Sequence, residues 1–165
     1  SYVASSEHIV GVIYGRPELF AGIFTSMGVL MALSTFGNSF LATRFGARQT
    51  IKWLLVMYTV VGGVLLLCSF NKLPDMLLFF IPIALLMSIN LMIEPNSSAL
   101  ALEPMGDNAG MASSVYGTIF FFIGASLGSV ISHFLHFGVL PLVISYFVIG
   151  LLTLGLVFGD RPIKN

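Results

Sequence analysis

Long apolar runs alternate with short polar turns along this chain. A helix needs about 20 mostly apolar residues to cross the hydrocarbon core of a bilayer, which is about 30 Å thick. Barrel strands are about half that length and alternate in polarity, which these runs do not. The pattern predicts an all-helical (all-α), polytopic membrane protein. Five uncharged runs carry this prediction, at residues 19–41, 53–70, 76–93, 109–132 and 139–159.

Most of the expected spans extend beyond these uncharged runs. Residues 1–15 add a partial first span, and residues 1–165 together are expected to make one transmembrane domain. The five full spans are then expected at residues 19–43, 51–70, 76–102, 109–135 and 139–159.

The segment at residues 1–15 is too short to cross a bilayer alone. It has no basic start, and it holds Glu7 and His8 where a signal peptide would be apolar. We therefore expect the chain to begin inside a helix, either as a truncation of a longer protein or as a half that pairs with a second copy. Glu7 lies eight residues before Gly15, about 12 Å along a helix and close to the expected midplane.

An ionised carboxylate at that depth costs roughly 2.5–3.5 kcal/mol. Glu7 is therefore expected to face protein or water, or to be protonated. The alternative is that Glu7 belongs to a frayed end of the chain.

Composition supports the membrane assignment. Apolar residues make up 57% of the chain, the mean hydropathy is +1.00, and only 7 basic and 7 acidic residues occur among 165. Soluble domains carry about 25% charged residues. The net charge of zero and the lack of a phosphate-cradling glycine loop argue against nucleic acid as a partner. No cofactor is expected.

The basic residues are distributed unequally between the two sides of the membrane. Cytoplasmic loops carry an excess of Lys and Arg, and five of the seven basic residues fall on the side where the chain begins and ends. Both ends are therefore predicted to be cytoplasmic, in the inner membrane of the cell. The five are Arg44, Arg48, Lys52, Arg161 and Lys164, against Arg16 and Lys72 on the other side.

A polar face is predicted in the fourth span. Asn90, Glu94 and Ser97 are four and three residues apart, so they share one face of a helix that continues past residue 93. Pro95 removes a backbone hydrogen bond, which membrane helices tolerate where a cavity or a neighbour satisfies the freed carbonyl. Glu94 is predicted to be an intramembrane acid. Alternatively, the helix is shorter, and Glu94 reaches the headgroups from its cytoplasmic end.

Small residues mark the fifth span as a packing helix. Gly124 and Gly128 form a GxxxG step for close helix contact, and Gly117 precedes them by two turns. The same step matches the GxSxG motif of serine hydrolases. That motif needs a strand–turn–helix setting, and an intramembrane protease needs a histidine on another span, so no enzyme is expected. His133 and His136 lack a third metal ligand nearby, so no metal site is expected.

The remaining spans differ in their polar content. Met31, Ser34 (or Thr35), Asn38 and Ala42 fall near one face of the second span, a spacing typical of helix packing. The third and sixth spans hold the fewest polar groups, and we expect them to face lipid.

Three stretches occur in an order and at intervals that one transporter family shares. Residues 38–48 (NSFLATRFGAR) resemble the loop signature Gly-x-Leu-Ala-Asp-Arg-x-Gly-Arg-Arg at Arg44, Gly46 and Arg48, with Ser39 and Thr43 replacing its first glycine and its aspartate. The others are residues 95–104 (PNSSALALEP) and 109–114 (AGMASS). Over essentially its whole length, the chain resembles the carboxy-terminal six-helix half of a major facilitator superfamily transporter. It is most similar to the bicyclomycin-resistance-like drug/proton antiporters.

The resemblance implies an architecture of two inverted three-helix units, with the first helix of each unit lining a central cavity. These helices would be the first and fourth spans, which carry Glu7 and Glu94. It also implies that Arg44 and Arg48 brace a cytoplasmic gate. Further implied partners are the lipid bilayer and a facing amino-terminal six-helix half or a second copy.

The leading hypothesis is a secondary active transporter that exports a small molecule or drug in exchange for protons. Its candidate proton- or substrate-binding residues are Glu7, His8, Asn90 and Glu94. An acid in low dielectric binds its proton more tightly, so it can exchange protons as a cavity opens to alternate sides. The alternative is a non-transporting structural or sensory bundle, in which these acids are packing or interfacial residues.

Overall fold

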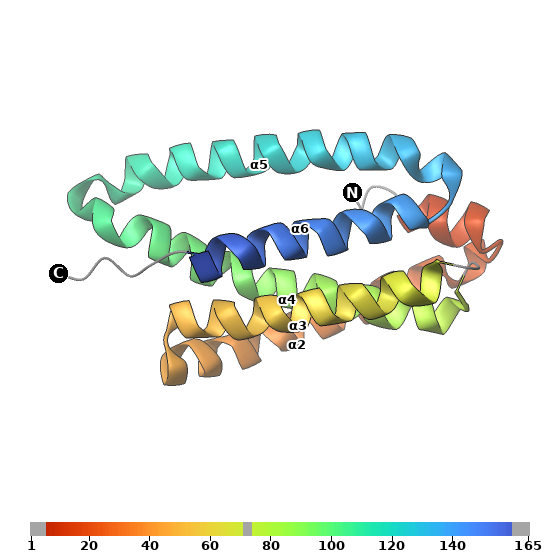
Figure 1. Ribbon diagram of the computed structural model, residues 1–165, viewed down its shortest axis with the longest axis horizontal. Helices are drawn as coiled ribbons and strands as arrows, with labels where there is room; N and C mark the ends of the chain where they lie inside the picture. Colours follow the sequence, from red (N-terminus) through yellow and green to blue (C-terminus); the bar gives the residue numbers. More distant parts are fainter. Residues whose placement is uncertain (1–5, 71–73, 160–165) are drawn as a thin grey trace.

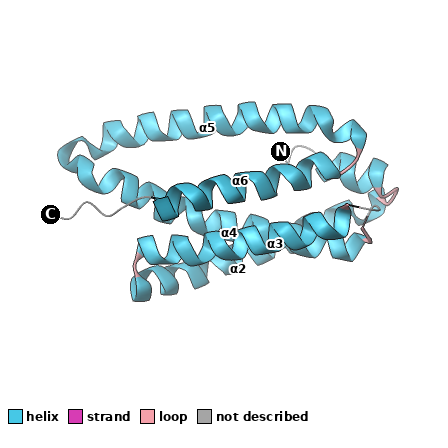
Figure 2. Cartoon of the chain, viewed as in Figure 1, coloured by secondary structure: helices cyan, strands magenta, loops and turns pink. Residues whose placement is uncertain are grey.

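Helices make up nearly all of the chain that the structure describes. The computed structural model describes residues 6–70 and 74–159, and these residues contain no strand (Figure 2). The predicted all-helical class is therefore confirmed. The long helices, which run back and forth along one axis (Figure 1), are α2 (Phe20–Phe45), α3 (Ala47–Ser69), α4 (Met76–Leu102), α5 (Ala109–His133) and α6 (Leu140–Gly159). The short elements are η1 (Ile9–Ile13), η2 (Pro17–Leu19), η3 (Glu103–Asn108) and η4 (Phe134–Phe137).

The long helices have the length and composition of membrane spans. Four continuous helical stretches among the described residues are long and apolar enough to cross a bilayer. One of them, Met76–His133, contains both α4 and α5. The two helices are joined through η3, inside which Gly106 adopts a non-helical φ of 49°. The stretches are Pro17–Phe45, Ala47–Ser69, Met76–His133 and Leu140–Gly159.

A glycine reverses the chain between α2 and α3. Gly46 has a φ of 79°, in the left-handed region that glycine tolerates at no steric cost. Its N–H donates to the Ala42 carbonyl at 2.9 Å and so caps α2. Its own carbonyl accepts hydrogen bonds from the N–H of Thr50 at 3.1 Å and from the Thr50 hydroxyl at 2.9 Å, which opens α3.

The core lies where α3, α4 and α6 meet. α3 packs against both α4 and α6, and α2 packs mainly against α4. The expectation that the third and sixth spans face lipid was wrong for one face of each helix. Lipid tails are as apolar as leucine, so a greasy face can contact either lipid or protein. The largest fully buried side chains are Phe79, Ile9, Leu65, Ile83, Leu86, Leu142, Val10 and Val143.

Glycines allow α3 and α6 to approach closely. A Cβ atom at Gly150 of α6 would lie 3.0 Å from Cδ1 of Tyr58 and 3.3 Å from Oγ1 of Thr59. A Cβ atom at Gly62 of α3 would lie 3.7 Å from Cα of Phe147. Small residues at these contacts give the backbones the short separation on which membrane helix packing depends.

The first described segment is short and caps one end of the bundle. It contains the π-helical stretch η1, in which Ile9 and Val10 are buried in the core. Tyr14 follows directly. Its hydroxyl donates to the Pro74 carbonyl at 3.0 Å, and its ring packs near Phe79. The segment is therefore held against the start of α4 by a hydrogen bond and a ring contact.

Two helices remain largely exposed. α5 buries no residue among those described, and α2 buries only Met27 and Asn38. Figure 1 shows α5 as the outermost helix, joined to the bundle at its two ends. Large apolar side chains such as Phe36 and Phe121 are more than 70% exposed. α2 and α5 therefore present long apolar faces with little protein contact.

Candidate functional site

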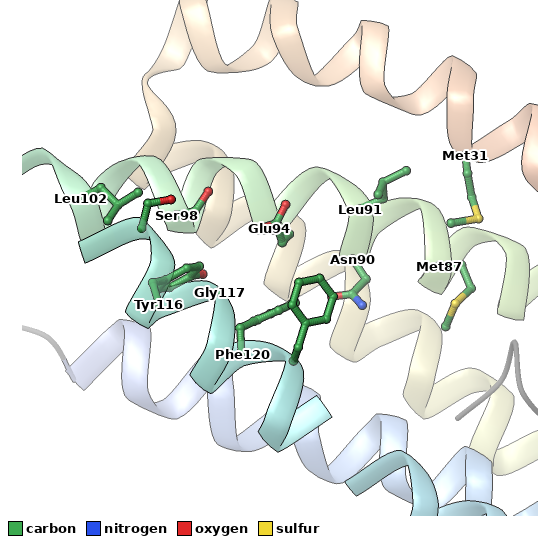
Figure 3. A pocket seen from close by; sticks show the side chains of 12 residues that line it. Met31, Met87, Asn90, Leu91, Glu94, Ser98, Leu102, Tyr116, Gly117 and Phe120 are labelled. Carbon is green, nitrogen blue, oxygen red and sulfur yellow. The ribbon is translucent and has the colours of Figure 1, made fainter. Parts of the chain in front are cut away.

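A cavity of about 510 Å³ opens between α4 and α5. Figure 3 shows its walls, with a row of α4 side chains facing α5 and with Met31 of α2 at one end. We call it the Glu94 cavity. It is lined by Met31, Met87, Asn90, Leu91, Glu94, Ser98, Leu102, Ser113, Tyr116, Gly117, Phe120 and Phe121.

The polar face predicted for the fourth span lines this cavity. Asn90, Glu94 and Ser98 are four residues apart, so they follow one face of the helix. The structure brings Asn90 and Glu94 together, as their spacing predicted. Ser98, not the expected Ser97, continues the row. Ser97 lies on another face, where its hydroxyl donates to the Ile93 carbonyl at 2.9 Å.

Glu94 lies well inside its helix. α4 continues to Leu102, eight residues beyond Glu94, which is about 12 Å of helix. The helix therefore does not end at Glu94, as the shorter-helix alternative required. Glu94 is half-buried, and among the described residues that line the cavity it is the only charged one.

The opposite wall comes from α5, which the sequence interpretation treated only as a packing helix. Ser113, Tyr116 and Phe120 recur at helical spacing and line the cavity together. Figure 3 shows Tyr116 and Phe120 beside the polar face of α4. Their position on one helix face could be read from the sequence, because these residues lie three and four apart. Nothing in the sequence showed that α5 would face Glu94.

A buried amide pair joins α2 to α4 close to this cavity. Asn96 Nδ2 donates to Asn38 Oδ1 at 2.7 Å and also to the Met92 carbonyl at 2.7 Å. Both side chains are buried. Asn38 belongs to the polar face predicted for the second span, and Asn96 directly follows Pro95. The pair fixes α2 against the part of α4 that carries Glu94.

Glu7 and His8 lie elsewhere. They are exposed and line a separate cavity of about 450 Å³ together with Gly11, Val12 and Pro17. This cavity adjoins η1 and η2, at the end of the bundle where α4 begins (Figure 1). Glu94 lies 18 residues from the start of α4, which is about 27 Å along the helix. The structure therefore does not bring the two predicted acids into one site.

The loop-signature residues occupy the α2–α3 turn. The Arg44 guanidinium lies 5.9 Å from the centroid of the Phe40 ring and 5.6 Å from that of Phe45, within cation–π range. Gly46 forms the turn described above. Arg48 lies in the first turn of α3 and lines a further cavity with Lys52.

Two of the predicted packing glycines of α5, Gly117 and Gly124, have open space where a side chain would begin. A Cβ atom at Gly117 or Gly124 would have nothing within 4 Å, and Gly128 is partly exposed. Their role in helix packing stays a prediction. Within the chain, close contact is made by Gly62 and Gly150 instead.

The described residues contain no group of three metal-ligating side chains. His133 ends α5 and His136 lies in η4, where the His136 ring contacts the His133 carbonyl and Phe137. The Glu94 cavity therefore offers one carboxylate, an amide, hydroxyl groups and aromatic rings. Such a set can hold a proton or a positively charged group, because no base on its walls competes for the carboxylate.

Comparison with known proteins finds one distant similarity to report. The chain is 29% identical over 133 residues to a protein of Haemophilus influenzae described as a bicyclomycin resistance protein homolog. The alignment covers 80% of this chain and 33% of that relative, so the chain spans about one third of the relative's length. No family model and no solved structure matches the chain. The chain is thus a polytopic helical membrane protein with distant similarity to a drug-resistance protein.

Proposed function

We propose that this chain is one half of a secondary active transporter that exports small molecules or drugs in exchange for protons. The observation that carries the proposal is the position of Glu94, a half-buried acid eight residues inside a membrane-length helix and on the wall of a 510 Å³ cavity. Ionisable residues inside membrane spans are costly, and they mark ion and substrate pathways. The similarity to a bicyclomycin resistance protein homolog agrees with drug export.

Glu94 and its neighbours have the chemistry that such a site requires. A carboxyl group on the wall of such a cavity can take up a proton from one side of the membrane and release it when the cavity opens to the other side. Asn90 and Tyr116 add hydrogen-bonding groups, and Phe120 adds apolar area. The volume lies in the range of about 300–1,000 Å³ typical of small-molecule sites. Glu7 and His8 are proposed as a second, outer proton site.

The exposed helices indicate what would complete the transporter. α2 and α5 carry long apolar faces with few contacts inside the chain. We propose that a facing amino-terminal six-helix half covers these faces, with a second copy of the chain as the alternative and the lipid bilayer around both. Gly117, Gly124 and Gly128 would then pack against that partner. Arg44 and Arg48 would brace the gate on the cytoplasmic side, where both ends of the chain are predicted to lie.

Export by the protein at its natural length tests this proposal. Everted membrane vesicles would be energised with a proton gradient, and uptake of bicyclomycin and of a panel of other drugs would be followed. Glu94→Gln is expected to abolish proton-driven uptake, and Glu7→Gln to reduce it. Glu103→Gln is the matched control, because Glu103 is exposed in η3 and lines none of the cavities described here.

The result also separates the proposal from a non-transporting structural or sensory bundle. Unchanged proton-coupled export in both the Glu94 and the Glu7 variants would contradict the role given to these acids. If Glu94→Gln lowered the stability of the protein and no drug in the panel were bound or moved by any version, the non-transporting bundle would be favoured.

A further inference from the structure

Two of the three histidines of the chain lie close together where α5 ends. His133 is the last residue of α5, and His136 follows three residues later, in η4. Their ring centres are 5.7 Å apart, and their ring planes are tilted by 76° to one another. Both side chains are exposed. We call these two residues the histidine pair.

The separation of the two rings suits a shared metal ion. Bonds from zinc to an imidazole nitrogen are about 2.0–2.1 Å long, and a ring nitrogen lies about 1.1 Å from its ring centre, so two imidazoles on one ion have ring centres roughly 5–6 Å apart. The observed 5.7 Å falls in this range. Because the two planes are tilted, they intersect along a line, and an ion on that line lies in the plane of both rings, where the nitrogen lone pairs point.

A backbone contact determines which nitrogen of His136 is free to bind. Nδ1 of His136 lies within hydrogen-bonding distance of the His133 carbonyl oxygen. A carbonyl oxygen only accepts, so Nδ1 donates, and the neutral ring keeps its lone pair on Nε2. Histidines that bind metals almost always donate their other ring nitrogen to a carbonyl, a carboxylate or water, which orients the ring. His136 therefore has the hydrogen bond that is typical of a metal ligand.

The chemistry of the histidine pair limits which metals fit. Among the residues that the structure describes, no third histidine, cysteine or acid joins the pair. The lack of a third ligand is the reason why the sequence predicted no metal site. Water can take the remaining positions, because both side chains are exposed. Imidazole ligands suit Zn²⁺, Cu²⁺ and Ni²⁺, whereas Ca²⁺ and Mg²⁺ require oxygen ligands.

We propose that the histidine pair binds a divalent transition-metal ion such as Zn²⁺, through one nitrogen of each ring and with water in the other positions. The ion would join the end of α5 to η4, which leads through Gly138 to the core residue Val139. α5 buries none of its described residues, so the ion would fix one end of this exposed helix to the bundle. The pair does not line the Glu94 cavity, so the proposal does not depend on the transport function.

Calorimetric titration of the purified protein with zinc chloride tests the proposal. The protein would be kept at its natural length in mild detergent, without a histidine tag. We expect saturable binding that depends on both rings and raises the Tm. His133→Gln and His136→Gln are each expected to weaken this binding at least about tenfold, since even residues that only hydrogen-bond to a metal ligand cost about 10–100-fold in affinity when they are replaced.

Two further variants separate metal binding from other effects. His8→Gln is the matched control, because His8 is also exposed but lines a different cavity, and it is expected to leave zinc binding unchanged. His133→Phe keeps an aromatic ring beside Phe134 but removes the ligand. It is expected to have the Tm of the wild type without zinc and to lose the increase that zinc causes.

The electron paramagnetic resonance spectrum of the protein with Cu²⁺ gives a direct readout of the ligands. We expect coupling to two imidazole nitrogens in the wild type and in His8→Gln, and to one fewer in His136→Gln. Unchanged zinc binding in His133→Gln or His136→Gln would overturn the proposal, and so would an equal loss in His8→Gln.

Discussion

Asn96 Nδ2 lies 2.7 Å from Asn38 Oδ1, although 58 residues separate the two side chains in the sequence. Both residues are buried, and their hydrogen bond joins α2 to α4 two residues after Glu94. Asn96 donates a second bond to the Met92 carbonyl, four residues earlier, just after Pro95 interrupts the backbone ladder. This pair connects the largely exposed α2 to the helix that carries the candidate site.

Replacing either asparagine should weaken the bundle unequally. Interhelical hydrogen bonds in membrane proteins contribute about 0.6 kcal/mol on average and up to about 1.7. Asn96→Ala should therefore lower the free energy of unfolding by about 1–2 kcal/mol, and Asn38→Ala by about 0.5–1, because Asn96 makes two bonds and Asn38 accepts only one of them. Unfolding in mixed detergent micelles measures both, and the double variant should lose less than the sum. Strict additivity would mean that the bond contributes nothing.

Two glycines should respond unequally to the same change. Gly150→Val would drive its side chain into the Tyr58 ring, whose Cδ1 lies 3.0 Å from the first added carbon, and overpacking of this kind costs about 1–3 kcal/mol. Gly124→Val meets nothing within 4 Å and should change stability in detergent by less than about 0.5 kcal/mol. Thermal unfolding followed by circular dichroism compares the two. Equal losses would contradict the α3–α6 packing.

Tyr14 should make the protein sensitive to alkali. Burial, with the nearby Asp75 carboxylate, raises the pKa of the Tyr14 hydroxyl above its usual range. The folded state therefore keeps this proton at pH values where the unfolded chain loses it. The protonated Tyr14 hydroxyl therefore contributes to the stability of the folded state. This contribution is fully present below about pH 10, the ordinary pKa of tyrosine, and is lost as pH rises further.

Tyr14→Phe tests this dependence. The variant loses the hydrogen bond to Pro74, which should cost about 0.5–1.5 kcal/mol near neutral pH. Its stability should then fall less steeply than that of the wild type between about pH 10 and 12. Parallel alkaline profiles for the two proteins would show that another group is responsible.

The helices could be predicted because a bilayer imposes a minimum length on every span. The apolar runs predicted an all-helical protein, and the spacing of Asn90 and Glu94 placed both on one face of α4. Helical periodicity is a local property, so it can be read from the sequence without knowledge of the fold.

The remaining features depend on which helices become neighbours. The GxxxG step of α5 identifies small residues but not a partner, and the close contacts are made by Gly62 and Gly150 instead. The Asn38–Asn96 bond and the contribution of Tyr116 to the Glu94 cavity both need a contact between distant segments. Apolar composition could not show which face of α3 is buried, because lipid and protein interiors are equally apolar.

The central claim is that Glu94 exchanges protons during transport, and collapse of a proton gradient tests it most directly. The protein at its natural length would be reconstituted into liposomes containing a pH-sensitive dye, and a transported compound would be added after a gradient is imposed. The account predicts rapid collapse with the wild type and with Glu103→Gln, and no substrate-dependent collapse with Glu94→Gln. Collapse at the wild-type rate in the Glu94→Gln protein would contradict it.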